Sequence, residues 1–438
     1  MEPYKTTNER WFDSIAVKML ILAFLGLLLL IPLQMVKQVI KERAAYAAEA
    51  KSEIASSWAT SQTITGPVLN IPVSLSSDGD SKYSSSVLHV LPEELSASAT
   101  IDPEIRYRGI YESVVYSSEI EISGRFDTDN IEKRDGYTYH WNRAYISLGV
   151  TDNRGLKGDI SITFEEAVCK AEPGPGQTDV FSNGISFPLD LSNFATENSK
   201  GRFHVKFGLK GSESLFFSPV GKNTRVNIAS TWTSPSFQGI FLPEERNISP
   251  EGFTARWTVT HFNRSFPQSW KGKSHLPEKE SFGVNLMMEV DHYKKAERSA
   301  KYGLLFILIT FFVLIIIEIR SAQRIHVFYY VLVAFALILF FSLMSALSEH
   351  TGFNAAYLIA SVATIGLLGA FFRSLLKKTS LVLTVSSLLS GLYLFIFILL
   401  ALKDYAFLAG NIGLFVLLAG MMMLSSKYQI FSNRKPGN

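Results

Sequence analysis

The sequence contains few of the residues that form disulfides, metal clusters and covalent catalytic sites. Cys169 is the only cysteine among 438 residues, which excludes an internal disulfide and a cysteine metal cluster. The sequence also lacks a His-Glu-x-x-His zinc motif and a Gly-x-Ser-x-Gly nucleophile elbow. A net charge of +3 does not indicate nucleic acid as a partner. We therefore predict no catalytic residue, no metal site, no cofactor and no nucleic-acid partner.

Long apolar runs are what the sequence does contain. A hydrocarbon core about 30 Å thick needs roughly 20 helical residues to cross it. One such run lies near the start of the chain and five crowd its end, with a long polar stretch between them. We predict six transmembrane helices, over residues 15–36, 303–317, 327–347, 353–372, 381–402 and 406–424. The sequence thus predicts a multi-pass protein in a lipid bilayer, with one span, a large water-facing domain over 37–302 and a five-span bundle over 303–424.

The orientation of these spans follows from the positive charges in the short connections. The connection Ser348–Asn354 has no Lys or Arg, and Lys403 is the only cation in the connection Lys403–Tyr405. Cations gather instead after the second span, after the fourth and in the tail: Arg320, Arg324, Arg373, Lys377, Lys378, Lys427, Arg434 and Lys435. We therefore predict that residues 1–14 and 425–438 are cytoplasmic and that 37–302 lie outside. A cleavable signal sequence is the alternative for the first run, but its length favours a retained anchor.

The domain over 37–302 begins with a helical pattern and continues with a strand pattern. Apolar residues recur every three to four positions from Ile40 to Trp58, which predicts a helical stalk over 37–60 that stops before Gly66-Pro67. We expect this stalk to pack on its own domain, with a partner-binding helix as the alternative. Residues 67–290 then alternate with period two, which predicts a mainly-β, antiparallel sandwich-like domain. The expected strands are 87–91, 105–116, 119–126, 145–150, 159–164, 203–209, 224–232 and 253–262.

Three features of this domain admit both a functional and a structural interpretation. The sequence Gly221-Lys222-Asn223-Thr224 is similar to a phosphate-binding loop, but the expected earlier glycine is missing, so we interpret it as a hairpin turn. Ser74–Ser86 is predicted to be a polar excursion. The tryptophans could form a glycan-stacking surface, although aromatic residues in strands usually belong to the core: Trp141, Trp232, Trp257 and Trp270.

Within the predicted spans the sequence gives little support to transport or catalysis. The middles of all six contain no Asp, Glu, Lys, Arg or His, which weakens an ion-coupled transporter. Ser348, Glu349 and His350 lie together in an outer loop, where a helix cap or a contact to the β domain is favoured over a nucleophile and its base. Six glycines are expected to allow close helix packing: Gly366, Gly369, Gly391, Gly410, Gly413 and Gly420.

A series of short motifs in order resembles the CreD family of inner-membrane cell-envelope integrity proteins over nearly the whole chain. The motifs include Arg108-Gly109-Ile110-Tyr111-Glu112, the run Ser234–Pro243 and Leu347-Ser348-Glu349-His350. The resemblance implies a protein of the bacterial inner membrane that is linked to envelope integrity and stress, and it implies no catalytic residue. The family-motif residues of unknown role are Pro235, Phe237, Gly239, Pro243, Asn263, Arg264, Asp291, Tyr293, His326, Ser348, Glu349 and His350.

The leading hypothesis is a non-enzymatic inner-membrane protein whose periplasmic β domain is an interaction or sensing platform. A transporter or export component that uses the C-terminal bundle is the first alternative, and a periplasm-facing hydrolase is the second. An envelope protein or a lipid-linked molecule is the expected partner of the platform. The sequence leaves the oligomeric state open.

Overall fold

The computed structural model describes residues 15–75, 85–128, 136–192, 200–286, 292–321, 325–376, 378–402 and 406–427. The chain divides into two compact units, a helical unit over Met1–Ala48 and Val290–Asn438 and a strand-rich unit over Glu49–Glu289. The predicted polar excursion falls mostly on residues 76–84, outside the described residues. Each unit has its own apolar core.

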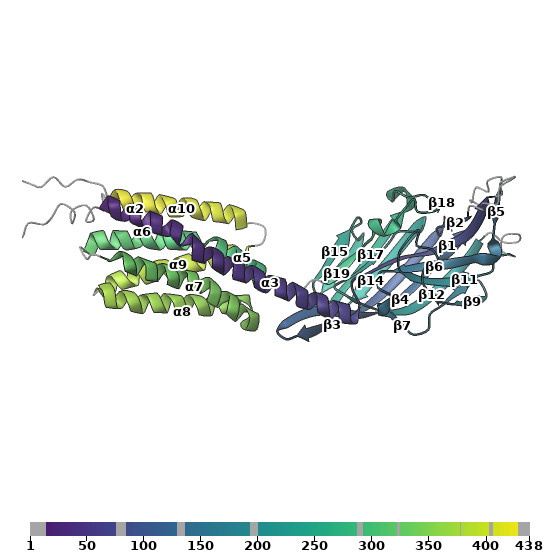
Figure 1. The fold of residues 1–438 in the computed structure, drawn as a ribbon, viewed down its shortest axis with the longest axis horizontal. Helices are drawn as coiled ribbons and strands as arrows, with labels where there is room; N and C mark the ends of the chain where they lie inside the picture. Colours follow the sequence, from purple (N-terminus) through teal and green to yellow (C-terminus); the bar gives the residue numbers. More distant parts are fainter. Residues whose placement is uncertain are drawn as a thin grey trace, which may run out of the picture. The chain divides into compact units, whose positions relative to one another are not determined.

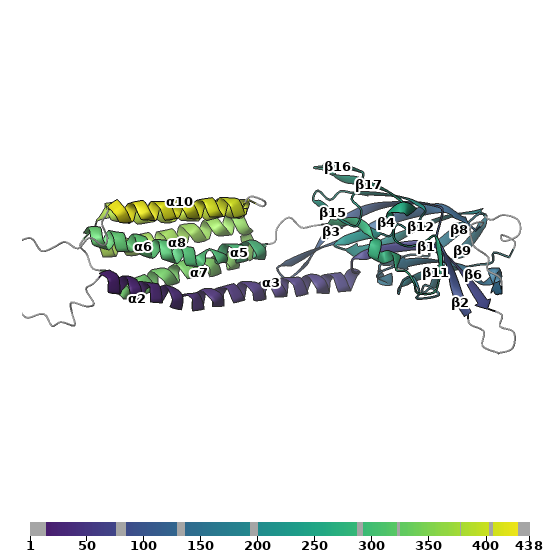
Figure 2. The same cartoon turned by 90° about the horizontal axis from the view of Figure 1, so that it is seen from above.

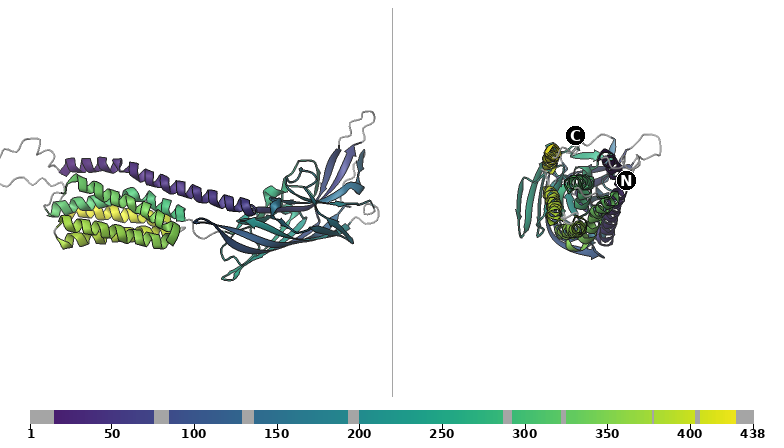
Figure 3. Two further views of the ribbon diagram at one scale, coloured as in Figure 1. Left: turned by 60° about the horizontal axis from the view of Figure 1, so that its bottom comes forward. Right: turned by 90° about the vertical axis from the view of Figure 1, so that its left-hand side faces the viewer.

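The helices carry the apolar runs of the sequence (Figure 1). They are α2 (Ile15–Leu28), α3 (Leu30–Trp58), α5 (His292–Lys301), α6 (Gly303–Ser321), α7 (Val327–Thr351), α8 (Phe353–Leu376), α9 (Thr379–Ala401) and α10 (Ala406–Lys427). Helices α2 and α3 follow one another around Leu29, whose backbone N–H still donates to Leu25 at 2.9 Å. Pro32 accounts for the interruption, because it has no N–H to donate to Leu28 four residues earlier. The helix that the sequence predicts over 37–60 is thus the second half of one long rod (Figure 3, left).

Four helices of the described chain are long and apolar enough to cross a membrane, namely α2–α3, α7, α8 and α9. The pair α5 and α6 makes a fifth if it is one span, although the two helices meet at a bend of 40°. The predicted second span, 303–317, lies within α6. Helix α10 contains a shorter apolar stretch over Leu408–Gly420. The count of six spans therefore stays a prediction.

Aromatic side chains fill the centre of the helical unit, whose helices are seen end-on in Figure 3 (right). The ring of Tyr393 on α9 lies 4.7 Å from that of Phe306 and 4.6 Å from that of Phe340, between ring centroids.

The glycines that the sequence predicts to allow close helix packing do not all do so. A methyl group at Gly413 would lie 1.9 Å from Phe395, so close packing is confirmed there. At three others the expectation is wrong, because a methyl group would meet no atom within 4 Å: Gly366, Gly391 and Gly420.

The strand-rich unit contains two sheets, which can be followed in Figures 1 and 2. The ten-stranded sheet contains β1 (Gln62–Leu75), β2 (Ser85–Val90), β5 (Tyr137–Tyr139), β6 (Ala144–Val150), β10 (Glu172–Pro173), β11 (Gly184–Leu189), β13 (Ser214–Phe217), β15 (Pro235–Gly239), β18 (Ser269–Lys271) and β19 (Phe282–Leu286). The nine-stranded sheet contains β3 (Glu94–Arg108), β4 (Tyr111–Asp127), β7 (Leu156–Lys157), β8 (Ser161–Phe164), β9 (Ala167–Lys170), β12 (Lys200–Ser212), β14 (Asn223–Ser230), β16 (Glu245–Ser249) and β17 (Gly252–Thr260).

One buried apolar cluster joins residues of both sheets. In β12 the side chains of Phe203, Val205, Phe207 and Leu209 are buried and alternate with exposed neighbours, as a half-buried strand requires. The tryptophans also belong to this cluster, because Trp257 and Trp270 are buried and Trp141 and Trp232 pack against it. The structural interpretation of the tryptophans is therefore confirmed.

The pairing of the strands differs from the prediction at several points. Two pairs are parallel, β1 with β13 and β14 with β3, whereas the sequence predicts antiparallel pairing throughout. Strand β1 begins at Gln62 and passes through Gly66-Pro67, where the sequence predicts only the end of a helix. The predicted strand over 105–116 in fact spans a hairpin that turns at Gly109, with φ of +63°. Residues 218–222 connect β13 of one sheet to β14 of the other, so Gly221-Lys222-Asn223-Thr224 is not the hairpin turn that the sequence predicts.

Candidate functional site

The run Ser234–Pro243 builds the edge of the ten-stranded sheet. Strand β15 holds Pro235, Phe237 and Gly239 against β19, and Pro243 follows in the connection to β16. The ring of Phe237 meets those of Phe253 and Trp257 edge-on at 5.7 Å, between ring centroids. At Gly239, with φ of +103°, a methyl group would lie 2.3 Å from the Ser281 carbonyl oxygen. Phe237 and Gly239 are thus explained by packing.

Asn263 and Arg264 hold a loop on the strand-rich unit. The Asn263 side-chain oxygen accepts from the Thr260 backbone N–H at 3.1 Å. Arg264 is buried and donates to the carbonyl oxygens of Phe266 and Pro267 and to the Gln268 side chain. Burial lowers the pKa of Arg264 to about 10, and the nearby Glu280 carboxylate opposes that shift. The guanidinium therefore satisfies loop carbonyls and is not directed at a ligand.

The Ser348, Glu349 and His350 trio lies in the last turns of α7 and not in a loop. Ser348 is buried and donates to the Ser345 carbonyl oxygen at 2.7 Å, while Glu349 accepts from the Tyr293 hydroxyl at 3.0 Å. Positions two residues apart on a helix point about 200° away from each other. Ser348 and His350 therefore do not face one another as a nucleophile and its base must.

The two remaining family-motif residues are His326 and Asp291. The His326 side chain caps the start of α7 by accepting from the Phe328 backbone N–H at 3.2 Å. Asp291 lies outside the described residues. The structure thus brings together Tyr293 and Glu349 but does not gather the predicted residues into one site.

A polar cavity of about 640 Å³ in the strand-rich unit is the candidate site. Pockets of this size hold small molecules in many proteins. Strands β1, β2 and β6, the turn before β6 and the segment between β10 and β11 supply its walls. The lining residues are Pro72, Val73, Ser74, Ser86, Val87, His140, Arg143, Tyr145, Gly176, Gln177 and Asp179.

Behind the cavity wall, two polar side chains interrupt otherwise apolar strands. Asn70 and His89 are each almost fully buried, and the Asn70 side-chain oxygen lies 2.7 Å from Nδ1 of His89. The Asn70 amide nitrogen donates to the Val68 carbonyl oxygen at 3.0 Å and to the Ser147 hydroxyl at 2.7 Å. Because these contacts fix the amide orientation, Nδ1 of His89 must be the donor to Asn70. In neutral His89, Nε2 is then an acceptor.

That acceptor faces a carboxylate. Nε2 of His89 lies 3.6 Å from Oδ2 of Asp179, whose side chain is 14% exposed. Burial lowers the pKa of His89, and the charge of Asp179 together with a hydrogen bond to it opposes that shift. Lys273 approaches the other carboxylate oxygen of Asp179, Oδ1, at 4.0 Å.

Tyr145, Ser74 and His140 supply further polar groups of the cavity wall. The Tyr145 hydroxyl is buried and unbonded, and burial together with Asp179 raises the pKa of Tyr145 to about 12. Its ring lies against Gly176, where a methyl group would be 2.5 Å from a ring carbon. Ser74 and His140 are joined at 2.9 Å. The cavity therefore presents the Asp179 carboxylate, the exposed Arg143 guanidinium and a Tyr145 hydroxyl that has no hydrogen-bond partner among the described residues.

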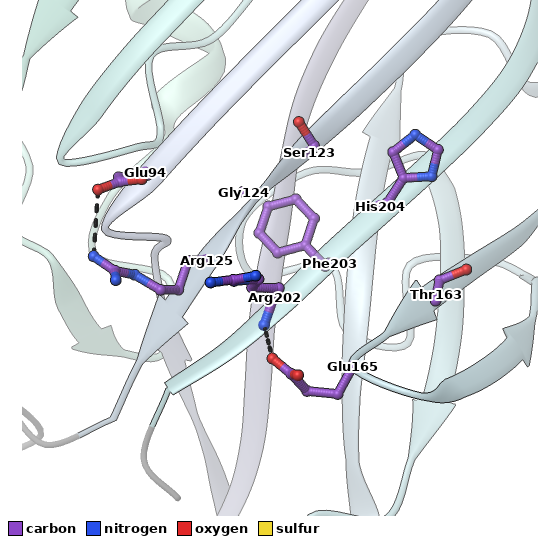
Figure 4. Close-up of a pocket in the computed structure, with 9 residues that line it drawn as sticks. All are labelled: Glu94, Ser123, Gly124, Arg125, Thr163, Glu165, Arg202, Phe203 and His204. Atoms are coloured by element: carbon purple, nitrogen blue, oxygen red, sulfur yellow. Dashed lines mark hydrogen bonds and ion pairs between the residues drawn. The ribbon is translucent and has the colours of Figure 1, made fainter.

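A second recess, of about 510 Å³, lies on the nine-stranded sheet and is drawn in Figure 4. Its two carboxylates already accept hydrogen bonds from other residues of the recess. Arg125 lies 3.3 Å from Glu94, and the backbone N–H of Arg202 donates to Glu165. Exposed ion pairs of this kind contribute little to stability. This recess is the weaker candidate.

The polar cavity is not among the features that we predict from the sequence. A signal was present, because Asn70 and His89 are single polar residues inside the apolar stretches Val68–Val73 and Val87–Leu91. A buried polar residue needs a partner, so two such interruptions predict a polar contact. Asp179 gave no such signal, since it lies in a loop whose path only the tertiary structure fixes.

Comparison with known proteins identifies the family. The family model described as inner membrane protein CreD matches residues 14–430. The inner membrane protein CreD of Escherichia coli strain K12 is 32% identical over 413 residues, which cover 91% of this chain and 90% of that protein. Two solved structures of an M1 zinc metallopeptidase from Deinococcus radiodurans align with TM-scores of 0.18 and 0.17, at 8% and 9% identity. The alignments cover 39% of this chain and 39% and 38% of those chains, and such scores carry no argument. The extent of the family match, together with the identity to the relative, shows that this chain belongs to the CreD family of inner membrane proteins.

Proposed function

We propose that this protein supports the integrity of the bacterial cell envelope without catalysing a reaction. In this proposal the strand-rich unit lies in the periplasm and is an interaction or sensing platform. The six predicted spans hold both termini in the cytoplasm. The platform recognises an envelope protein, a lipid-linked molecule or a small envelope component.

The observation that carries this proposal is the polar cavity, in a unit that is joined to apolar helices at both ends. A rod of two helices enters the strand-rich unit, and α5 and α6 follow it. Tethering at both ends suits a fixed platform better than a mobile carrier. The family-motif residues near 235–243 and 263–264 support the same view, because their side chains stabilise the strand-rich unit.

The first test separates a platform from a transporter. A variant that lacks residues 327–424 keeps α2, α3, the strand-rich unit and α6. A platform should largely retain protection of cells against envelope stress, scored as survival in detergent, at equal amounts of membrane-inserted protein. Loss of protection to the level of a null strain would favour the transporter.

The second test addresses a periplasm-facing hydrolase. Alanine substitution of Ser348, Glu349 and His350 together should leave protection unchanged if the three side chains have no catalytic role. A matched control is Thr351→Ala, since that hydroxyl also donates to a carbonyl oxygen of α7, at 3.1 Å. Loss of protection in the triple variant but not in the control would favour the hydrolase hypothesis.

A further inference from the structure

We propose that the helical unit binds the phosphate of an anionic phospholipid between Lys37 on α3 and Lys301 on α5. The lipid is a component of the bilayer that holds the protein. This inference goes beyond the proposed function, because it concerns the helical unit and not what the strand-rich unit recognises.

The first step is the position of the two lysines relative to the apolar runs. Lys37 directly follows the first predicted span, and Lys301 lies two residues before Gly303, where the second begins. A methyl group at Gly303 would lie 2.6 Å from the Leu33 side chain, so the two segments pack closely near the ends of their apolar runs. The headgroups of a bilayer lie at this level.

The second step is the direction of the Lys37 side chain. The buried face of α3 carries Leu33 and Ile40, and Lys37 lies about one helical turn from each of them on the same face. Lys37 is itself half-buried. Ile40 belongs to the same apolar cluster as Ala300 of α5, the residue before Lys301. The Lys37 side chain is therefore on the face of α3 that packs against α5.

The third step is the charge at this point. The charges of Lys301 and Lys41 repel the Lys37 ammonium group, and the Glu297 carboxylate supplies an opposing charge. The structure thus brings like charges together in a partly buried position, where their repulsion is costly. A phosphate between Lys37 and Lys301 would accept hydrogen bonds from both ammonium groups and replace this repulsion by attraction.

The fourth step is the choice between a bound phosphate and lysines that only reach toward water. A lysine at the end of a span commonly extends its ammonium group to the headgroup region without a specific partner. Such cations are in excess on the cytoplasmic side, whereas the predicted topology puts Lys37, Lys41 and Lys301 on the opposite side. Three cations close together on that side favour a specific anion. Anionic lipid headgroups are the anions that a bilayer supplies next to a span.

The test is native mass spectrometry of the full-length protein in detergent, with equal amounts of dioleoyl phosphatidylglycerol and dioleoyl phosphatidylcholine. The two lipids have the same acyl chains, but the choline cation of the second neutralises its own phosphate. We expect one phosphatidylglycerol molecule to stay bound in preference to phosphatidylcholine. One lysine near an anionic headgroup contributes about 5-fold in affinity. Lys37→Gln and Lys301→Gln should therefore each lower the preference by about that factor.

The matched control is Lys51→Gln, because Lys51 is a half-buried lysine on the same helix, about 21 Å further along its axis. The control should leave the preference unchanged. An equal preference in the native protein and in the Lys37 and Lys301 variants, or an equal loss in the control, would overturn the inference. Displacement of the lipid by an equal concentration of inorganic phosphate would also overturn it, because the site would then take the free ion.

Thermal unfolding separates this site from a lysine with a merely structural role. In phosphatidylcholine alone, Lys37→Gln should unfold at a temperature no lower than that of the native protein, because the substitution removes a repulsion. Added phosphatidylglycerol should raise the unfolding temperature of the native protein more than that of Lys37→Gln. Equal increases would contradict the site. Neither measurement depends on the protection of cells, so its failure would leave the proposed function standing.

Discussion

At the scale of single residues, Asp152 secures the end of α3. Its carboxylate accepts from the Thr60 backbone N–H at 3.0 Å and from the Arg154 side chain at 2.6 and 2.9 Å. Arg154 in turn donates to the Ser56 carbonyl oxygen at 2.6 Å, one of the carbonyls that the last turn of α3 leaves unpaired. Gln62, which is fully buried, bonds both backbone groups of Asp152. One carboxylate therefore joins the stalk, β1 and the turn after β6.

We predict that Asp152→Asn lowers the free energy of unfolding of the strand-rich unit by about 2 kcal/mol, because charged hydrogen bonds are lost in a partly buried site. Urea denaturation in detergent, monitored by tryptophan fluorescence, measures this free energy of unfolding. Asp190→Asn is the control, since that carboxylate only accepts from Ser192 on the surface. Equal stability of the Asp152 variant and the control would contradict this role.

The same carboxylate predicts a pH dependence. The hydrogen bonds from Arg154 hold the pKa of Asp152 well below its usual value. A depressed folded pKa contributes stability that is fully present above the unfolded pKa of about 4 and is lost as the pH falls toward the folded value. The native protein should therefore lose more stability than Asp152→Asn between pH 5 and pH 2, which denaturation curves at several pH values can measure.

At the scale of elements, an ion pair joins α2 to α6 near the ends of the two helices. Lys18 contacts both Glu318 carboxylate oxygens, at 2.6 and 2.5 Å, and the Ile325 carbonyl oxygen at 2.5 Å. The Tyr330 hydroxyl donates to the same carboxylate at 3.2 Å. Both charged side chains are less than one-fifth exposed, so removing one partner leaves the other poorly solvated.

We predict that Glu318→Gln destabilises the helical unit by about 2 kcal/mol. The charge-swapped variant, Lys18→Glu with Glu318→Lys, should recover part of the stability that is lost. Lys18→Glu alone should destabilise the helical unit more than Glu318→Gln or the charge-swapped variant does. Thermal unfolding in detergent, read from light scattering and helical circular dichroism, ranks the variants. A charge-swapped pair that is no better than its single variants would show that the contact is incidental.

A period-two pattern in the sequence does not always correspond to one strand. The alternation from Ile105 to Tyr116 reads as one strand, but Gly109 provides a positive φ and a two-residue connection joins β3 to β4. Beyond Asp102 no side chain of β3 is buried, so the end of the hairpin has no burial pattern for the sequence to reveal. The parallel pairing of β1 with β13 is equally invisible, because pairing partners far apart in sequence leave no local signal.

At the scale of the whole molecule, the single cysteine provides a test of topology without engineering. Cys169 lies on β9 and is half-buried, and burial raises the pKa of its thiol. If the strand-rich unit is periplasmic, a membrane-impermeant maleimide should label Cys169 in spheroplasts without detergent. Labelling should be faster at pH 8.5 than at pH 7, because more thiolate forms as the pH rises.

The control for this topology test carries Cys169→Ser together with Ser432→Cys in the predicted cytoplasmic tail. This variant should be labelled only after detergent opens the membrane. Labelling of position 432 in closed spheroplasts, with Cys169 protected until detergent is added, would invert the topology. The periplasmic platform would then be wrong.

The sequence by itself determined the features that depend on local composition and period. Apolar runs predict the membrane helices, because each charged residue in lipid costs free energy whatever the rest of the chain does. The spacing of Ile40, Ala47 and Ile54 predicts the buried face of α3. Only the tertiary structure decided the polar cavity. Asn70, His89, Arg143 and Asp179 come from separate strands and loops, and their proximity depends on strand order and loop path. Those are set by the packing of the whole core, which no stretch of sequence encodes alone.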